Sequence, residues 1–337
     1  MQLILHTFNL ELRHTFKITH ESRDSQPTLI IELRHKGHVG YGEATATKYY
    51  GLDVMQMKEK VQSLKQIIEE TPFDTPEQFW TDMAPHLKGH TFEQCALDVA
   101  AHDLYAKIAG KPLYKVWGLQ LKNLPITNYT LGMASINESI SKMEEMPWPL
   151  YKIKLGGKND LETIKALRLH TTATFRVDAN TGWNAEQTIK LAPQLKKLGV
   201  EFIEQPMPAA AWDQMKEVYK KSALPIVADE SCQIETDIKK CAEYFHVVNI
   251  KLMKCGGLTP ARRMIHEAKS LGLKVMVGCM TESSIGISAI AHLLPLLDYV
   301  DMDGALLLKY DIATGVEVRR DGYRFPDRNG TGAELKE

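Results

Sequence analysis

From about residue 124 onward, the chain repeats a short apolar segment, a loop and an amphipathic segment eight times. The apolar segments are typical of β-strands and cover residues 124–129, 150–154, 174–177, 202–203, 226–228, 247–250, 274–277 and 299–302. The segments between them, such as 160–170, 184–198 and 260–271, are typical of helices. Alternating strands and helices favour a parallel sheet, and eight units in fewer than 200 residues predict a (β/α)-barrel, modified where its last helices are short. An open doubly wound sheet is the alternative, but no strand is followed by a GxGxxG pattern.

The first third of the chain has a different pattern, which predicts an α+β domain over residues 1–122. Strand-like residues 28–33 and 39–42 flank a Lys36-Gly37 turn, as in an antiparallel hairpin. Residues 53–70 and 92–109 carry apolar side chains at helical spacing. We expect the barrel to occupy residues 123–313 and the tail, residues 314–337, to return to the N-terminal domain and complete it.

Charge and cysteine content exclude several classes of protein. The 41 basic and 42 acidic side chains give a net charge of −1, which argues against a nucleic-acid binder and against a polybasic membrane anchor. The five cysteines form no CxxC pair and predict reduced thiols in a cytoplasmic protein. A homo-oligomer is compatible with the sequence, although no coiled-coil stripe predicts one.

Charged or polar residues follow the predicted strands at a nearly constant interval. Lys154, Asp178, Glu204, Asp229, Lys254, Cys279 and Asp301 are separated by 24, 26, 25, 25, 25 and 22 residues. Because the carboxyl ends of parallel barrel strands share one rim, these side chains should form a ring around an active site.

The residue types in this ring indicate a chemistry. Asp178, Glu204 and Asp229, without histidine or cysteine, suit a hard cation with oxygen ligands, Mg²⁺ first and Mn²⁺ next. The alternative is a metal-free cluster in which lysines and arginines neutralise the three acids. Lys154 and Lys254 flank the acids along the chain and would face each other, as proton removal and return on opposite faces of one carbon require. A lysine acts as a base only when its pKa is lowered by burial or by a nearby cation.

Several strings resemble the enolase superfamily and, within it, the muconate-lactonising and dipeptide-epimerase branch. They are Gly40-Tyr-Gly-Glu-Ala44, Lys152-Ile-Lys154, Asp178-Ala-Asn180, Glu204-Gln-Pro206, Ala228-Asp-Glu230 and Lys251-Leu-Met-Lys-Cys-Gly-Gly257. The resemblance extends over nearly the whole chain and keeps the motif order. It implies a capping domain over a modified barrel, a Mg²⁺ site and no organic cofactor.

The resemblance also implies roles for single residues. Asp178, Glu204 and Asp229 would bind Mg²⁺, and Lys154 and Lys254 would be the acid/base pair. Lys152 would hold the substrate carboxylate and depress the pKa of Lys154. Asn180 and Glu230 would lie behind the metal ligands. The shared reaction is removal of the proton α to a carboxylate, with an enediolate stabilised by the metal.

A second motif narrows the substrate. Asp301 and Asp303, at i and i+2, resemble the DxD pair with which dipeptide epimerases bind the α-ammonium of the substrate. The alternative is a polar strand end at which Asp303 opens a turn. By the same resemblance, Thr130 and the segment from Cys279 to Thr281 would contact the substrate.

The loop at residues 19–24 resembles the family segment that selects the second side chain of the dipeptide. Epimerases of Ala-Glu place a basic residue there, whereas an ungapped alignment places Glu21, with Arg23 two positions later. We therefore expect an Ala-X dipeptide in which X is small or neutral. Two alternatives remain: a lyase of the o-succinylbenzoate synthase or muconate cycloisomerase type, and a barrel that binds a ligand without chemistry.

Overall fold

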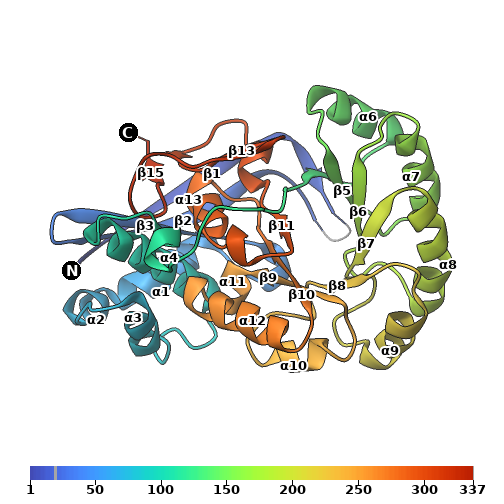
Figure 1. The fold of residues 1–337 in the computed structure, drawn as a ribbon. Helices are drawn as coiled ribbons and strands as arrows, with labels where there is room; N and C mark the ends of the chain where they lie inside the picture. The colour runs from blue at the N-terminus through green and yellow to red at the C-terminus, as the bar shows by residue number, and fades with distance from the viewer. Residues whose placement is uncertain (19–20, 337) are drawn as a thin grey trace.

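The computed structural model describes residues 1–18 and 21–336. It joins an N-terminal antiparallel sheet with its helices to a parallel eight-stranded barrel sheet, confirming the predicted fold class (Figure 1). The predicted specificity loop, residues 19–24, lies partly outside the described residues, since Thr19 and His20 are not among them. Across the described ranges, no helix combines the length and apolarity that crossing a membrane requires.

The N-terminal sheet contains β1 (Gln2–Lys17), β2 (Ser22–His35) and β3 (His38–Thr45) in that order, all antiparallel. The predicted hairpin turn is present, and Lys36 and Gly37 both adopt positive φ, of 49° and 76°. Two such residues in succession match the right-handed twist of paired strands. In Figure 1 the long β1 and β2 strands extend from the N-terminal part toward the barrel, where Lys17 O accepts a bond from Met133 N at 2.7 Å.

Helices cover one side of this sheet. They are α1 (Val54–Ser63), α2 (Lys65–Glu70), α3 (Pro76–Met83), α4 (Thr91–Ile108) and the short α5 (Leu113–Val116). The predicted single helix at 53–70 is therefore two helices. Helix α4 packs closely on β3 because Gly40 and Gly42 have no side chain, and a Cβ on Gly42 would clash with Ala96 O.

The barrel sheet has eight parallel strands in chain order. They are β4 (Tyr129–Leu131), β5 (Leu150–Lys154), β6 (Thr174–Asp178), β7 (Val200–Glu204), β8 (Ile226–Ala228), β9 (Val247–Lys251), β10 (Lys274–Gly278) and β11 (Tyr299–Asp301). A parallel bridge between Thr127 and Val300 links the two ends of the sheet. The predicted first strand, 124–129, is wrong in its bounds: regular pairing begins only at Tyr129, four residues after Pro125. A proline lacks the N–H that a strand ladder needs.

Helices alternate with these strands around the outside of the barrel (Figure 1). They are α6 (Ile136–Glu145), α7 (Asp160–Arg168), α8 (Ala185–Lys197), α9 (Trp212–Lys221), α10 (Asp237–Cys241), α11 (Leu252–Cys255), α12 (Leu258–Ser270) and α13 (Ser284–Ala291). After β11, a 3₁₀ turn, Gly304–Leu307, stands where the last barrel helix would be, so the barrel is modified at its end, as expected.

The C-terminal tail returns to the N-terminal part, as predicted. The tail contains the paired strands β12 (Ala313–Thr314) and β15 (Glu334–Leu335) and the hairpin of β13 (Glu317–Arg319) and β14 (Gly322–Arg324). Asp103 of α4 accepts bonds from Thr331 N and Oγ1, and Gly330 O accepts one from Leu113 N. The boundaries after residues 122 and 313 stay a prediction.

A buried histidine joins this tail to the barrel. His292, 1% exposed, accepts a bond from Tyr114 N at Nδ1 and donates through Nε2 to Thr331 O. Burial lowers the pKa of His292 to about 4. The stabilising effect of this neutral imidazole is complete above its unfolded pKa near 6.5, and it is lost as the pH falls from 6.5 to about 4, a loss of about 3 kcal/mol.

We expect the ¹⁵N spectrum of His292 to show the neutral Nε2–H tautomer at pH 5, where exposed histidines are protonated. Lowering the pH from 7 to 4 should reduce the free energy of unfolding more in the wild type than in His292→Gln, which lacks the imidazole. Protonation of His292 with a midpoint near pH 6.5 in the folded protein would contradict this account.

Candidate active site

The carboxyl ends of the barrel strands bring most of the predicted ring together. Lys152 and Lys154 lie on β5, Asp178 ends β6, Glu204 ends β7 and Asp229 follows β8 directly. All five side chains are buried or nearly so. The strand-end spacing in the sequence has thus become a cluster at one end of the barrel.

The three acids converge on a single point. Asp178, Glu204 and Asp229 each offer a carboxylate oxygen within 4.8 Å of the other two, and all three residues are buried. Asn249 Nδ2 donates to Glu204 Oε1 at 2.8 Å, and the backbone N–H of Asn180 donates to Asp178 Oδ1 at 2.9 Å. Three converging, oriented carboxylates match the oxygen ligands of a hard divalent cation.

Two further side-chain oxygens next to this cluster are free to accept hydrogen bonds. Asn180 Oδ1 and Glu230 Oε2 are buried and have no hydrogen-bond partner among the described residues, although both residues line the cavity. Burial, with the nearby charge of Asp229, raises the pKa of Glu230 to about 8. Acceptors of this kind fit a site that holds a cation and its water ligands, so the donor set is consistent with a metal.

Lysines neutralise the acids in this structure. Lys152 Nζ lies 2.7 Å from Glu204 Oε2, 3.1 Å from Asp178 Oδ2 and 2.7 Å from Asp301 Oδ2. Burial opposes the charge of Lys152, but these acids hold the pKa of its ammonium well above the ordinary value. Lys154 Nζ donates to Asp178 Oδ2 at 2.7 Å and lines the cavity.

The structure corrects the placement of the lysine on the opposite side. Lys254, predicted to face Lys154, has a side chain that is 0% exposed and does not line the cavity. Lys251, the last residue of β9, lines the cavity, is 12% exposed and donates through Nζ to Asp229 Oδ2 at 2.9 Å. The chain turns into α11 directly after Lys251, and this turn carries Lys254 behind Asp229.

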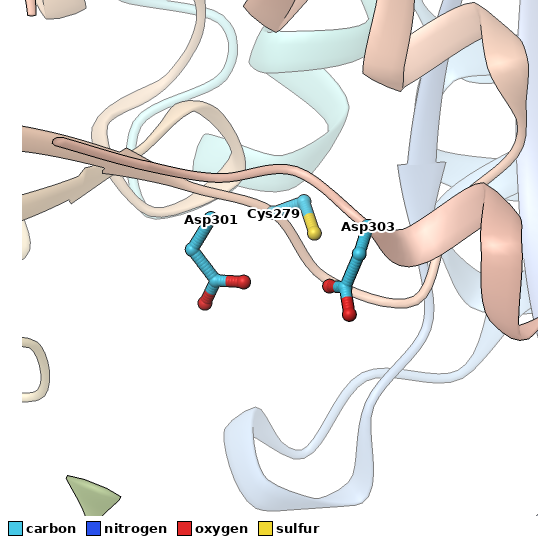
Figure 2. A group of neighbouring side chains, drawn as sticks. All are labelled: Cys279, Asp301 and Asp303. Carbon is cyan, nitrogen blue, oxygen red and sulfur yellow. The ribbon is translucent and has the colours of Figure 1, made fainter. Parts of the chain in front are cut away.

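Asp301 and Asp303 lie together at the end of β11. Figure 2 shows both carboxylates extending to the same side, with the sulfur of Cys279 between them, and one atom of each of the three lies within 4.8 Å of the others. Asp303 Oδ2 accepts a bond from Thr130 N at 2.5 Å. Burial and the neighbouring Asp301 raise the pKa of Asp303 to about 7, so a cation placed between the two acids would complete their ionisation.

The N-terminal part closes the cavity from the other side. Arg23 Nη2 donates to Thr281 Oγ1 at 3.0 Å, and Arg23 Nη1 lies 3.4 Å from Glu21 Oε2. Glu21 and Arg23 both line the cavity, so this segment brings an acidic and a basic side chain into it together. Desolvation lowers the pKa of the Arg23 guanidinium, which lies 5.5 Å from the centre of the Phe16 ring.

Comparisons with known proteins follow the same division of the chain. The model of the mandelate racemase / muconate lactonizing enzyme N-terminal domain matches residues 2–118, and the enolase C-terminal domain-like model matches residues 136–337. The chain belongs to the mandelate racemase / muconate lactonizing enzyme family.

Relatives within this family are similar over most or all of their length. An L-Ala-D/L-amino acid epimerase of Flavobacterium johnsoniae is 57% identical over 99% of this chain and 100% of its own. An L-Ala-D/L-Glu epimerase of Bacteroides thetaiotaomicron is 37% identical over 98% of this chain and 87% of its own. The crystal structure of a dipeptide epimerase from Cytophaga hutchinsonii with Mg and D-Ala-L-Val is 26% identical, covers 100% of this chain and 96% of its own, and superposes with a TM-score of 0.94.

Several residues that line the cavity of this protein were not predicted from the sequence. Lys251 could have been found, because it ends the apolar segment 247–250 directly, whereas Lys254 follows three residues later. Other missed lining residues are Phe16, Ile18, Gln26, Thr45, Thr47, Tyr49, Tyr50 and Leu307. Apart from Leu307 they belong to the N-terminal part, and no strand-end pattern in the barrel predicts them.

Proposed function

We propose that the protein is a Mg²⁺-dependent dipeptide epimerase that inverts the α-carbon of the second residue of Ala-X, where X is neutral. The observation that carries this proposal is the placement of Lys154 and Lys251 in one cavity, on β5 and β9, with the three-acid cluster on the strands between them. The names of the similar proteins, which include L-Ala-D/L-amino acid epimerases, support it.

Asp178, Glu204 and Asp229 would hold the Mg²⁺ ion, with Mn²⁺ as a substitute. When bound, the ion would supply positive charge to offset the negative charge that develops on the substrate carboxylate as the α-proton leaves. Asn180 and Glu230 would accept bonds from water at this site, and Lys152, which lies among the three acids and Asp301, would contribute a second fixed positive charge.

Lys154 and Lys251 would be the two bases, in place of the pair Lys154 and Lys254. An α-carbon held between them presents its hydrogen to one lysine in the L-configuration and to the other in the D-configuration. One lysine removes the proton and the other returns a proton to the opposite face, which inverts the centre. The side chain of Lys254 is 0% exposed and does not line the cavity, which favours Lys251 in this role.

Asp301 and Asp303 would bind the α-ammonium of the alanine residue. Both carboxylates are buried, and Thr130 N–H and Asn128 Nδ2, the latter 2.8 Å from Asp301 Oδ1, hold them in place. Cys279 and Thr281 line the same side of the cavity and would contact the peptide. The lyases considered as alternatives act on substrates without an ammonium group and have no use for such a pair.

The side chain of X would meet the Glu21–Arg23 pair. Because the two charges lie in contact and cancel, we expect turnover of Ala-X with neutral X and poor turnover of Ala-Glu and Ala-Lys. Glu21→Gln leaves Arg23 without its ion-pair partner and should raise kcat/KM for Ala-Glu by about tenfold, in line with ~1–2 kcal/mol for a partly buried charge pair. Arg23→Gln should favour Ala-Lys instead.

The experiment is a panel of Ala-X dipeptides followed by chiral chromatography, with Mg²⁺ and with chelator, for the wild type and both variants. Epimerisation of neutral X that stops on chelation supports the proposal. A wild type that prefers Ala-Glu, or variants that leave the order of kcat/KM among the substrates unchanged, would contradict the assignment of X.

We propose a cytoplasmic location, since all five cysteines carry free thiols in the structure.

A further inference from the structure

Lys254 is a buried ammonium that the proposed reaction does not use. Its Nζ donates to Asp229 Oδ1 at 2.6 Å, to Asp229 O at 2.5 Å and to Cys232 O at 2.8 Å. An ammonium has three N–H donors, and these three oxygens are enough to occupy all of them, with a fourth oxygen, Asn249 O, farther away at 3.5 Å. The side chain is therefore saturated by groups of the segment that follows β8.

The turn that carries Lys254 is fixed from outside the barrel. Helix α11 is followed by Gly256 and Gly257, whose φ values of 94° and 122° favour glycine. Trp80 of α3 donates through Nε1 to Gly256 O at 2.8 Å, and a Cβ on Gly257 would clash with the Asp98 carboxylate of α4. Asp98 in turn accepts bonds from Thr259 N and Oγ1, so the N-terminal helices hold this turn against the barrel.

Asp229 is thus held by two lysines with different surroundings. Lys254 binds Oδ1 from behind, away from the cavity, and Lys251 contacts Oδ2 on the cavity side. Burial works against ionisation of Asp229, but Lys251 and Lys254 hold the pKa of its carboxyl below the ordinary value. If Lys251 moves during proton transfer, Lys254 remains as the fixed partner of this carboxylate.

We propose that Lys254 is a positioning residue that orients the Asp229 carboxylate, and the backbone at Asp229 and Cys232, for divalent-cation binding. This inference rests on the proposed function for the identity of the site, but it concerns affinity for the cation and not the proton transfer. Residues that hold metal ligands by hydrogen bonds typically change metal affinity by ~10–100-fold when they are replaced.

The test is a titration with Mn²⁺ followed by electron paramagnetic resonance, without substrate, on the wild type, Lys254→Met and Lys107→Met. Lys107 is a matched control, because it is a partly buried lysine that ion-pairs with Asp103 at 2.8 Å outside the cavity. We expect the Kd for Mn²⁺ to rise at least tenfold in Lys254→Met, as for other residues that hold metal ligands. In Lys107→Met, the Kd should stay within about twofold, since exposed or remote pairs do not reach the site.

Deuterium exchange at the substrate α-carbon gives a second readout on the same variants. Because Lys254 acts on both half-reactions through Asp229, Lys254→Met should slow exchange from the L- and D-configured dipeptides by similar factors. A variant that binds Mn²⁺ like the wild type, or that loses exchange from one configuration alone, would overturn the inference. If the wild type exchanges no dipeptide, the proposed function fails, whereas the Mn²⁺ comparison still decides the role of Lys254.

A measurement on the wild type covers the case in which Lys254→Met does not fold. Reductive methylation of the folded protein, mapped by mass spectrometry, should modify Lys251 and leave Lys254 unmodified. Methylation of Lys254 at a rate similar to that of Lys251 would place it on the cavity and overturn the inference.

Discussion

Lys251→Ala is expected to abolish α-proton exchange from one configuration of the substrate and to leave exchange from the other configuration measurable. Lys154→Ala should give the opposite pattern. The reason is geometric: Lys154 and Lys251 line one cavity from β5 and β9, with β6, β7 and β8 between them, so each would face one side of a carbon held over the acids. Loss of a positioned acid or base typically costs ~10²–10⁴-fold, and epimerisation, which needs both, should fall by at least this factor in each variant.

The measurement follows the α-¹H signal of L-Ala-L-X and L-Ala-D-X separately in D₂O. Lys158→Ala is the matched control, because Lys158 is an exposed lysine in the loop after β5. If Lys251→Ala slowed both configurations equally, or left both unchanged while Lys254→Ala abolished one of them, the assignment of Lys251 would be wrong.

Asp303→Asn is expected to raise KM for Ala-X by roughly 100-fold, with a smaller change in kcat. In the proposed complex, removing one charge from the buried pair that would bind the ammonium leaves the substrate charge poorly compensated, at a cost of about 3 kcal/mol. Asp303 is the cleaner position to test, since Asp301 also contacts Lys152 at 2.7 Å and its replacement would disturb the three-acid cluster.

N-acetyl-Ala-X provides the control for this variant. It lacks the ammonium, so the wild type should turn it over poorly. Asp303→Asn should reduce the difference in kcat/KM between Ala-X and N-acetyl-Ala-X. Unchanged kinetics in Asp303→Asn would remove the ammonium site and would favour a substrate without an amino group, such as that of a lyase of the same fold.

The barrel and the three-acid cluster were predictable because they depend on local patterns. Each strand ends at a change from apolar to polar residues, and parallel strands bring these ends to one rim, so Asp178, Glu204 and Asp229 are placed together by topology alone. Asp301 and Asp303 were predictable for the same reason, with their side-chain direction set by the i, i+2 spacing.

The prediction placed Lys254 incorrectly because the regular 25-residue interval selected it in preference to the strand end. The chain leaves the strand and turns into α11 immediately after Lys251, so Lys254 lies on this short helix and its ammonium is buried against Asp229 and Cys232. Tyr49 and Tyr50 line the cavity, and Arg23 contacts Thr281, only because of the way the N-terminal part docks on the barrel. No pattern within either part contains that information.

The most direct test of the central claim is deuterium incorporation by the wild-type protein. L-Ala-L-X dipeptides with neutral X are incubated in D₂O with Mg²⁺, and deuterium is located by NMR and mass spectrometry. The account predicts deuterium at the α-carbon of X alone, with accumulation of the L-Ala-D-X epimer and no exchange after chelation. Absence of exchange across the panel with Mg²⁺ present, or exchange at the alanine α-carbon in its place, would contradict it.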